Sequence, residues 1–259
     1  MIRVILALLL LGASEGAAFA GEQRAVYRAS GADARLFDQY DDDGYSLEVA
    51  PLPDGSITLT VRVSDAPLAS TAPFPPTSRS GATPPAAPDR DAFARRLVSG
   101  SRTQQEAVRR LLAGIAAEVR YDADRLRRQD PAAVFASRRA YCVGFADLAV
   151  DLLSRVGIAA RTVQGVLRGE PGGEAYEPEI GGVYHRWIEV YYPDRGYVFS
   201  DPRFSINGVD ARYIPFGRRA LARPKDLKVV LEEIVGTLSY ESFLVGTTRM
   251  RIRPSHSPM

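Results

Sequence analysis

The sequence predicts an α+β fold in which helices precede an antiparallel sheet, and three observations support this. Apolar residues recur at helical spacing over residues 104–120, a second amphipathic pattern begins near Cys142, and three strand-like segments follow it. Helices that precede the strands, instead of alternating with them, favour α+β over α/β architecture.

The first helix is expected over residues 104–120, with Thr103 as its N-cap. The second is expected to begin at Cys142 and to end before Gly157, which stands where a left-handed C-cap residue belongs. The apolar positions that define the two patterns are Ala107, Val108, Leu111, Leu112, Ile115 and Val119 in the first, and Phe145, Leu148, Ala149, Leu152 and Leu153 in the second.

The strands of the sheet are expected at residues 160–167, 183–191 and 197–200. The last two flank Pro193-Asp194-Arg195-Gly196, which is a strong turn signal. These elements form the centre of a predicted core at residues 91–215.

A small β-rich module is expected before this core, at residues 21–66. Residues 45–49 and 57–63 read as a hairpin around Pro53-Asp54-Gly55. The run Asp41-Asp42-Asp43-Gly44 resembles a calcium loop only superficially, because it lacks the ligand spacing and the terminal Glu, and a solvated turn is the preferred interpretation.

The remaining segments are a linker and a C-terminal extension. Residues 67–90 contain seven prolines, which predicts an extended, mobile linker. Residues 216–259 form an extension that could add a strand at 229–239 before a mobile tail.

The N-terminus predicts export. Arg3, an apolar run over residues 4–11 and the sequence Ala18-Phe19-Ala20 have the layout of a signal peptide covering residues 1–20. The run is too short to cross a bilayer, so we expect a periplasmic or secreted protein with no membrane span after signal removal. The net charge of +2 and the lack of a dense basic run argue against nucleic-acid binding.

Cys142 is the single cysteine, so it cannot form an internal disulfide. One interpretation is a buried cysteine that acts as a small apolar side chain. The other is a nucleophile, because the start of a helix favours a thiolate. His185 on a strand and Asp201 after the next strand would complete a Cys–His–carboxylate arrangement, whereas a metal site of the same residues lacks ligand-spacing support.

Residues 104–202 resemble the transglutaminase-like superfamily, which has papain-like chemistry. The segment YCVGFADLAVDLLSRVGIAARTVQG resembles its nucleophile helix and following strand, HRWIEVYY its "His-Ala-Trp-x-Glu" strand, and GYVFSDP its "Gly-Trp-x-x-x-Asp-Pro" ending. Three positions depart from the family pattern, and none of them removes a reacting group: Ala140, Arg186 and Tyr197.

The resemblance implies a nucleophile helix packed on an antiparallel sheet, with Cys142 as nucleophile, His185 as general base and acid, and Asp201 as the orienting carboxylate. It implies no cofactor and no metal. Trp187 is expected to share the His185 face and to wall the cleft or to be a core aromatic. Tyr141 and Tyr121 are further cleft candidates.

The expected activity is attack on an amide through a cysteinyl thioester. Hydrolysis of a peptide, protein or cell-wall peptide is slightly favoured over transfer to a primary amine. The alternative is a non-catalytic binding or structural protein that keeps the fold, in which the thiol would be unreactive.

Overall fold

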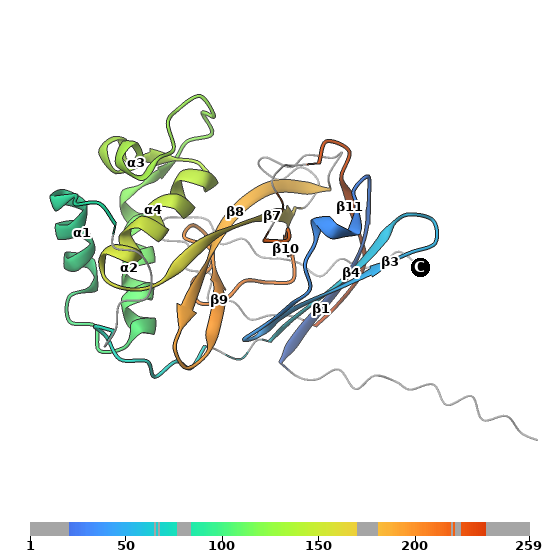
Figure 1. The fold of residues 1–259 in the computed structure, drawn as a ribbon, viewed down its shortest axis with the longest axis horizontal. Helices are drawn as coiled ribbons and strands as arrows, with labels where there is room; N and C mark the ends of the chain where they lie inside the picture. The colour runs from blue at the N-terminus through green and yellow to red at the C-terminus, as the bar shows by residue number, and fades with distance from the viewer. Residues whose placement is uncertain are drawn as a thin grey trace, which may run out of the picture.

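The computed structural model describes residues 21–64, 66, 68–76, 84–169, 181–218, 220 and 224–236. The predicted signal peptide and the predicted C-terminal tail lie outside these residues, the tail from residue 237 onward. The described chain forms three layers: a group of helices, a four-stranded sheet and a five-stranded sheet (Figure 1).

Both predicted helices are present, and the described residues contain two more. Thr103 caps the first predicted helix, where its hydroxyl accepts a hydrogen bond from the Glu106 amide. The second begins at Cys142, and Gly157 follows it with a φ of +83°, which glycine adopts without strain. The helices are α1 (Pro88–Val98), α2 (Gln104–Glu118), α3 (Pro131–Ser137) and α4 (Cys142–Arg155).

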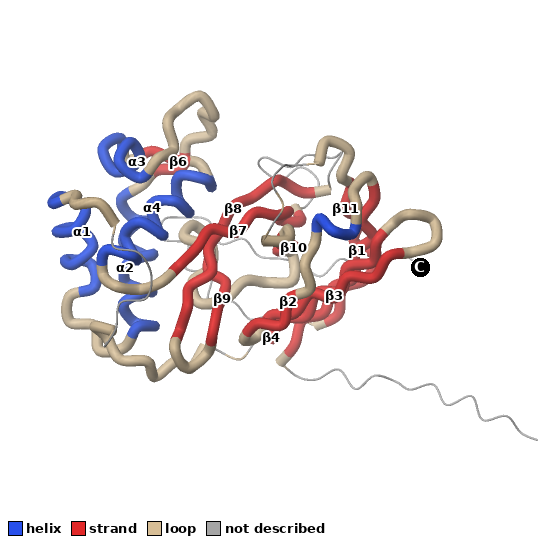
Figure 2. The backbone as a smooth tube through the Cα atoms, in the orientation of Figure 1, coloured by secondary structure: helices blue, strands red, loops and turns tan. Residues whose placement is uncertain are grey.

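The central sheet contains the three predicted strands and confirms the α+β prediction. Its order is β10-β7-β8-β9, and every pairing is antiparallel. Helix α4 packs against β7 and β8, as Figure 2 shows with helices in blue and strands in red. The strands are β7 (Ala160–Arg168), β8 (Gly182–Tyr192), β9 (Gly196–Ser200) and β10 (Tyr213–Pro215).

The second sheet has the order β11-β1-β4-β3-β2. The predicted hairpin is its β3–β4 pair, and Asp43 and Gly44 form a tight turn between β2 and β3, as the turn interpretation expects. The strands are β1 (Glu22–Ser30), β2 (Tyr40–Asp42), β3 (Tyr45–Pro51), β4 (Ile57–Ser64) and β11 (Lys228–Val235), with a short 3-10 helix η1 (Ala34–Leu36) between β1 and β2.

The five-stranded sheet is not built from residues 21–66 alone. Strand β11 comes from the C-terminal extension and pairs antiparallel with β1, from Ser30↔Lys228 to Arg24↔Val235. The alternate buried residues of β1, β3 and β4 belong to the same apolar cluster as Trp187 and Phe199 of the central sheet. The five-stranded sheet therefore completes the core that lies behind the central sheet.

The central sheet is buried on both faces. Trp187 belongs to the cluster shared with the five-stranded sheet, whereas its neighbour Ile188 belongs to the cluster shared with the helices. Alternate side chains of a strand point to opposite faces. His185 therefore shares the Trp187 face, and Arg186 faces α4, where it lies 3.1 Å from Asp147.

The segment predicted as a linker is partly ordered against the core. Residues 68–76 run along it, where Ser70 and Thr71 donate hydrogen bonds to Asp194 in the β8–β9 turn. The linker also ends earlier than residue 90, because Pro88 occupies the first turn of α1, where its missing N–H costs no helical hydrogen bond.

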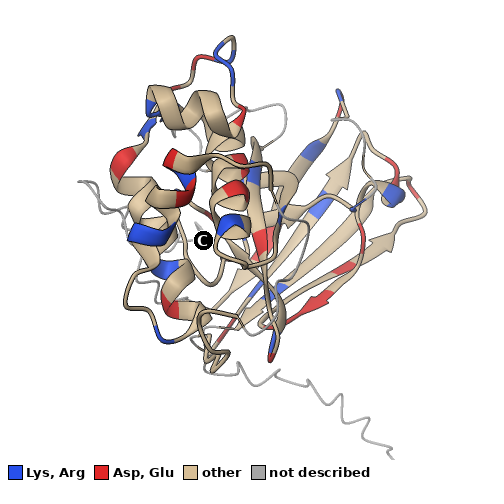
Figure 3. Ribbon diagram, turned by 60° about the vertical axis from the view of Figure 1, so that its left-hand side comes forward, with Lys and Arg blue, Asp and Glu red and all other residues tan. Residues whose placement is uncertain are grey.

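Charged residues of both signs are interspersed over the helices and sheets (Figure 3). Among the described residues, no helix has the length and apolar character that a bilayer crossing requires.

Candidate active site

Cys142 is the first residue of α4, and Tyr141 is the N-cap. The amide N–H groups of a first helical turn have no partner within the helix and form the positive end of its dipole, which favours a thiolate. The Cys142 residue is only partly buried, so it is not sealed within the apolar core.

The first turn of α4 is packed tightly from one side. The Gln129 side-chain oxygen accepts a hydrogen bond of 3.1 Å from the Tyr141 amide. A methyl group at Gly144 would lie 2.4 Å from that same oxygen and 2.9 Å from the Ala140 Cβ. Gly144 therefore allows the loop that carries Gln129 to approach the helix start and to fix the position of the nucleophile.

His185 and Asp201 form a buried pair next to this helix start. The His185 Nε2 atom lies 2.6 Å from Asp201 Oδ2, and the two residues are 6% and 1% exposed. The imidazole and the Cys142 thiol interact closely enough that His185 lowers the pKa of the thiol and the thiol raises the pKa of His185. Because Nε2 faces the carboxylate, Nδ1 is the ring nitrogen left for the sulfur. The structure thus brings together the three residues that the sequence singled out.

Asp201 has two further donors. The Tyr213 hydroxyl donates to Asp201 Oδ2 at 2.9 Å, and the Arg203 amide donates to Oδ1 at 2.9 Å. The Tyr213 ring is 2% exposed and packs edge-on against the rings of His185 and Trp187. Hydrogen bonds to the ionised carboxylate keep Asp201 charged and fixed beside the imidazole.

The electrostatics favour a thiolate–imidazolium pair. Burial acts to lower the pKa of His185, but the charge of Asp201 and its hydrogen bond outweigh this and raise that pKa to about 9. Burial acts to raise the pKa of Cys142, but the hydrogen bond and charge of His185 and the amide of Arg186 leave it below its ordinary value. Burial also opposes ionisation of Asp201, yet the His185 charge holds the pKa of that carboxyl low.

Trp187 backs the histidine and does not line an open cleft. Its side chain is fully buried, and its ring stacks on the His185 ring with centroids 6.1 Å apart. Gly165 of β7 pairs with His185, and a methyl group there would lie 2.6 Å from the indole and 2.1 Å from the Ile214 carbonyl oxygen. The absence of a side chain at Gly165 lets Trp187 and β10 pack close behind His185.

The two tyrosine candidates lie near the nucleophile. Tyr141 directly precedes Cys142 and is partly exposed. Tyr121 belongs to β5 (Arg120–Tyr121), which pairs in parallel with β6 (Arg139–Ala140), so it lies beside Ala140. Its ring is covered by the Arg203 guanidinium at 3.7 Å.

Three residues near the site were not identified from the sequence: Gln129, Arg203 and Tyr213. Gln129 and Tyr213 belong to none of the motifs that carry the family resemblance. Arg203 directly follows the Asp201-Pro202 motif, and its position there was a usable signal.

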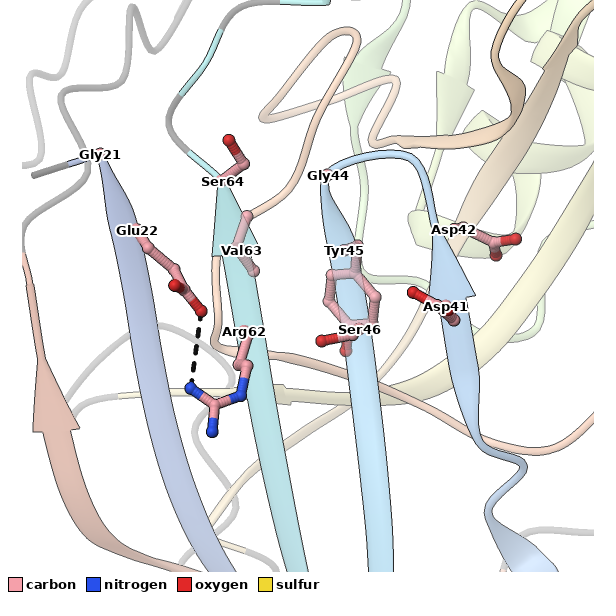
Figure 4. A pocket seen from close by; sticks show the side chains of 10 residues that line it. All are labelled: Gly21, Glu22, Asp41, Asp42, Gly44, Tyr45, Ser46, Arg62, Val63 and Ser64. Carbon is pink, nitrogen blue, oxygen red and sulfur yellow. Dashed lines mark ion pairs between the residues drawn. The ribbon is translucent and has the colours of Figure 1, made fainter. Parts of the chain in front are cut away.

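A pocket of about 370 Å³ lies elsewhere, at one end of the five-stranded sheet (Figure 4). Its lining includes Asp41, Asp42 and the ion pair between Glu22 and Arg62. No residue of the Cys142 site contributes to it, so the chemistry described above does not depend on this pocket.

Comparison with known proteins supports the family resemblance. Residues 91–202 match the family model of the transglutaminase-like superfamily. A stretch of 75 residues is 36% identical to the uncharacterized protein YebA of Bacillus subtilis, covering 27% of this chain. The chain spans only 10% of the length of that relative.

Two solved structures show a distant likeness. One is a protein from Cytophaga hutchinsonii for which a cysteine protease activity has been suggested. It is 13% identical to this chain, with a TM-score of 0.42, and the likeness covers 83% of this chain and 87% of the other. The other is the periplasmic domain of TgpA from Pseudomonas aeruginosa, 17% identical with a TM-score of 0.35, over 72% and 88% of the two chains.

Proposed function

We propose that residues 91–202, which form a transglutaminase-like core, carry an exported thiol enzyme that acts on amide bonds through a cysteinyl thioester. The observation that supports this most strongly is the buried His185–Asp201 pair, whose histidine lowers the pKa of the Cys142 thiol at the start of α4. A buried structural cysteine would need neither a histidine at its sulfur nor a carboxylate behind that histidine.

The proposed first half-reaction follows from this arrangement. The Cys142 sulfur attacks the carbonyl carbon, and the helix N-terminus, including the Cys142 amide N–H, stabilises the negative oxygen. The His185 imidazolium gives its proton to the leaving amine as the C–N bond breaks. The products are a thioester on Cys142 and a free amine, while Asp201 keeps the imidazole oriented.

In the second half-reaction, His185 removes a proton from the acceptor as it attacks the thioester, and the C–S bond breaks to return the Cys142 thiolate and the His185 imidazolium. Water releases a carboxylic acid, and a primary amine forms a new amide. We propose hydrolysis as the main outcome, because Cys142 is only partly buried and selective transfer would need a site that excludes water. Peptides, proteins and cell-wall peptides are the candidate substrates, and export rests on the sequence of residues 1–20.

The test uses a panel of peptides, including glutamine-containing ones, with and without a fluorescent primary amine. We expect peptide cleavage without amine incorporation, together with its loss in the Cys142→Ala variant. Amine incorporation in place of cleavage would overturn the preference for hydrolysis. A thiol that reacts with iodoacetamide only after denaturation would exclude the enzyme altogether.

A further inference from the structure

Arg203 follows Asp201-Pro202, and its guanidinium lies against two aromatic rings. Its central carbon is 3.7 Å from the centre of the Tyr121 ring and 4.5 Å from that of Phe204. The Phe204 ring is in turn 6.0 Å from the His185 ring. One aromatic contact therefore connects Arg203 to the histidine side of the site.

The other aromatic contact connects it to the nucleophile side. Tyr121 pairs with Ala140, two residues before Cys142, and the Asp122 amide donates to the Ala140 carbonyl. The Arg203 amide also donates to Asp201. Arg203 is thus held near the reacting groups by its backbone amide and by the contacts of its guanidinium with the two rings.

Other arginines around the site are neutralised by carboxylates, and Arg203 is not. Arg186 lies 3.1 Å from Asp147, and Arg139 lies 3.5 Å from Asp122. Within the described residues, Arg203 forms no ion pair and its side chain donates no hydrogen bond. None of its nitrogens is among the buried polar atoms that lack a partner.

A purely structural role explains only part of this arrangement. Stacking on the aromatic rings stabilises the position of a guanidinium and uses its faces. The N–H donors lie in the plane of the group, and their fork matches a carboxylate bidentately. A cation that stacks on aromatic rings near the helix start, with its in-plane donors open to solvent, is suited to binding an anionic ligand.

We propose that Arg203 binds a carboxylate of the substrate that lies close to the reacting amide. This inference rests on the proposed function and narrows its substrate class to acyl compounds that carry an acidic group near that amide. The carboxylate can be a chain terminus or an acidic side chain, and both present the same two oxygens to the guanidinium.

The first test uses two thiol reagents that differ in charge. Iodoacetate carries a carboxylate and iodoacetamide does not, and both alkylate Cys142. In a partly aqueous environment, one unit charge close to the reacting sulfur changes the rate of iodoacetate relative to that of iodoacetamide by roughly 2- to 6-fold. We expect Arg203→Met to lower the iodoacetate-to-iodoacetamide rate ratio by that factor, and 1 M NaCl to reduce the difference between the two proteins.

Three control variants isolate the effect. Arg35→Met changes the net charge equally at an exposed position on η1, and should leave the ratio unchanged. Arg203→Lys keeps the charge and should retain most of the ratio. Arg203→Gln serves where Arg203→Met fails to fold, as judged by circular dichroism, and if both neutral variants unfold the residue is structural and the proposal is wrong.

The outcomes separate the two proposals. If native wild-type Cys142 does not react with iodoacetamide, the proposed enzyme fails. If it reacts but Arg203→Met leaves the ratio unchanged, only the role of Arg203 fails. Matched peptide substrates with a free terminal carboxylate, an acidic side chain or neither then identify the source, and we expect Arg203→Met to slow only the acidic ones, by 10-fold or more.

Discussion

The Tyr213→Phe substitution tests whether Asp201 depends on the tyrosine hydroxyl. This change removes one oxygen atom from a side chain that is 2% exposed and leaves the ring in place. The lost hydrogen bond, 2.9 Å long, ends on a buried carboxylate, and bonds to charged groups contribute about 1.5–3 kcal/mol. Asp201 keeps His185 and the Arg203 amide as donors, so we expect a loss within this range and no collapse of the site.

Tyr27→Phe is the matched control. The Tyr27 side chain is fully buried, and its hydroxyl donates at 2.7 Å to the Ala211 carbonyl, which is neutral. We therefore expect a smaller loss of about 1 kcal/mol in the free energy of unfolding. Guanidinium chloride unfolding of both variants measures the difference.

The reactivity of the thiol provides the second measurement. Loss of one donor raises the pKa of Asp201, so the acidic limb of the Cys142 alkylation profile should move to higher pH in Tyr213→Phe. It should not move in Tyr27→Phe. Equal stability losses and identical pH profiles in the two variants would refute the assignment of Tyr213 as a positioning residue for Asp201.

Two further variants test the ion pair and the packing behind it. The pKa of the wild-type Cys142 thiol lies below its ordinary value, so we expect iodoacetamide to alkylate it at a lower pH than it alkylates an ordinary thiol. In His185→Ala the partly buried thiol loses that support, so its pKa should rise, and alkylation at neutral pH should slow roughly tenfold for each unit of that rise. An unchanged pH profile would contradict the pair. Gly165→Ala places a methyl group 2.1 Å from the Ile214 carbonyl oxygen and should cost about 1–3 kcal/mol, whereas Gly208→Ala meets nothing within 4 Å and should cost less than about 0.5 kcal/mol. Chemical unfolding of both variants checks this, and similar midpoints would show that β10 and the indole can move away from Gly165.

The parts of the fold that the sequence predicted are those determined by local chemistry. The start of α4 at Cys142 and the turn at Gly157 follow from helical periodicity and a left-handed glycine, which are properties of adjacent residues. The β8–β9 pairing follows from one turn sequence, and the resulting register places Ser200, the residue before Asp201, opposite Ile188. The candidates Cys142, His185 and Asp201 came from such local motifs together with the resemblance to the transglutaminase-like superfamily.

Pairings between distant segments could not be predicted in the same way. Strand β1 pairs with both β4 and β11, and nothing in its own sequence indicates a partner near the C-terminus. The alternation of apolar and polar residues along a strand specifies which of its faces is buried but not which strand lies beside it. A strand with one buried face can therefore pair with many partners. For the same reason, the sequence did not predict that β10 pairs with β7 or that Tyr213 donates a hydrogen bond to Asp201.

The five-stranded sheet has a function in this arrangement beyond completing the core. Three of its tyrosines donate hydrogen bonds to backbone carbonyls of one segment: Tyr27 to Ala211, Tyr45 to Tyr213 and Tyr40 to Phe216, at 2.7, 2.6 and 3.2 Å. That segment includes β10, which supplies the Tyr213 hydroxyl to Asp201. The buried hydroxyls of these three tyrosines are thereby satisfied, and the same bonds fix the strand that orients the carboxylate. The sheet thus stabilises the site from behind, although it contributes no residue to the reaction.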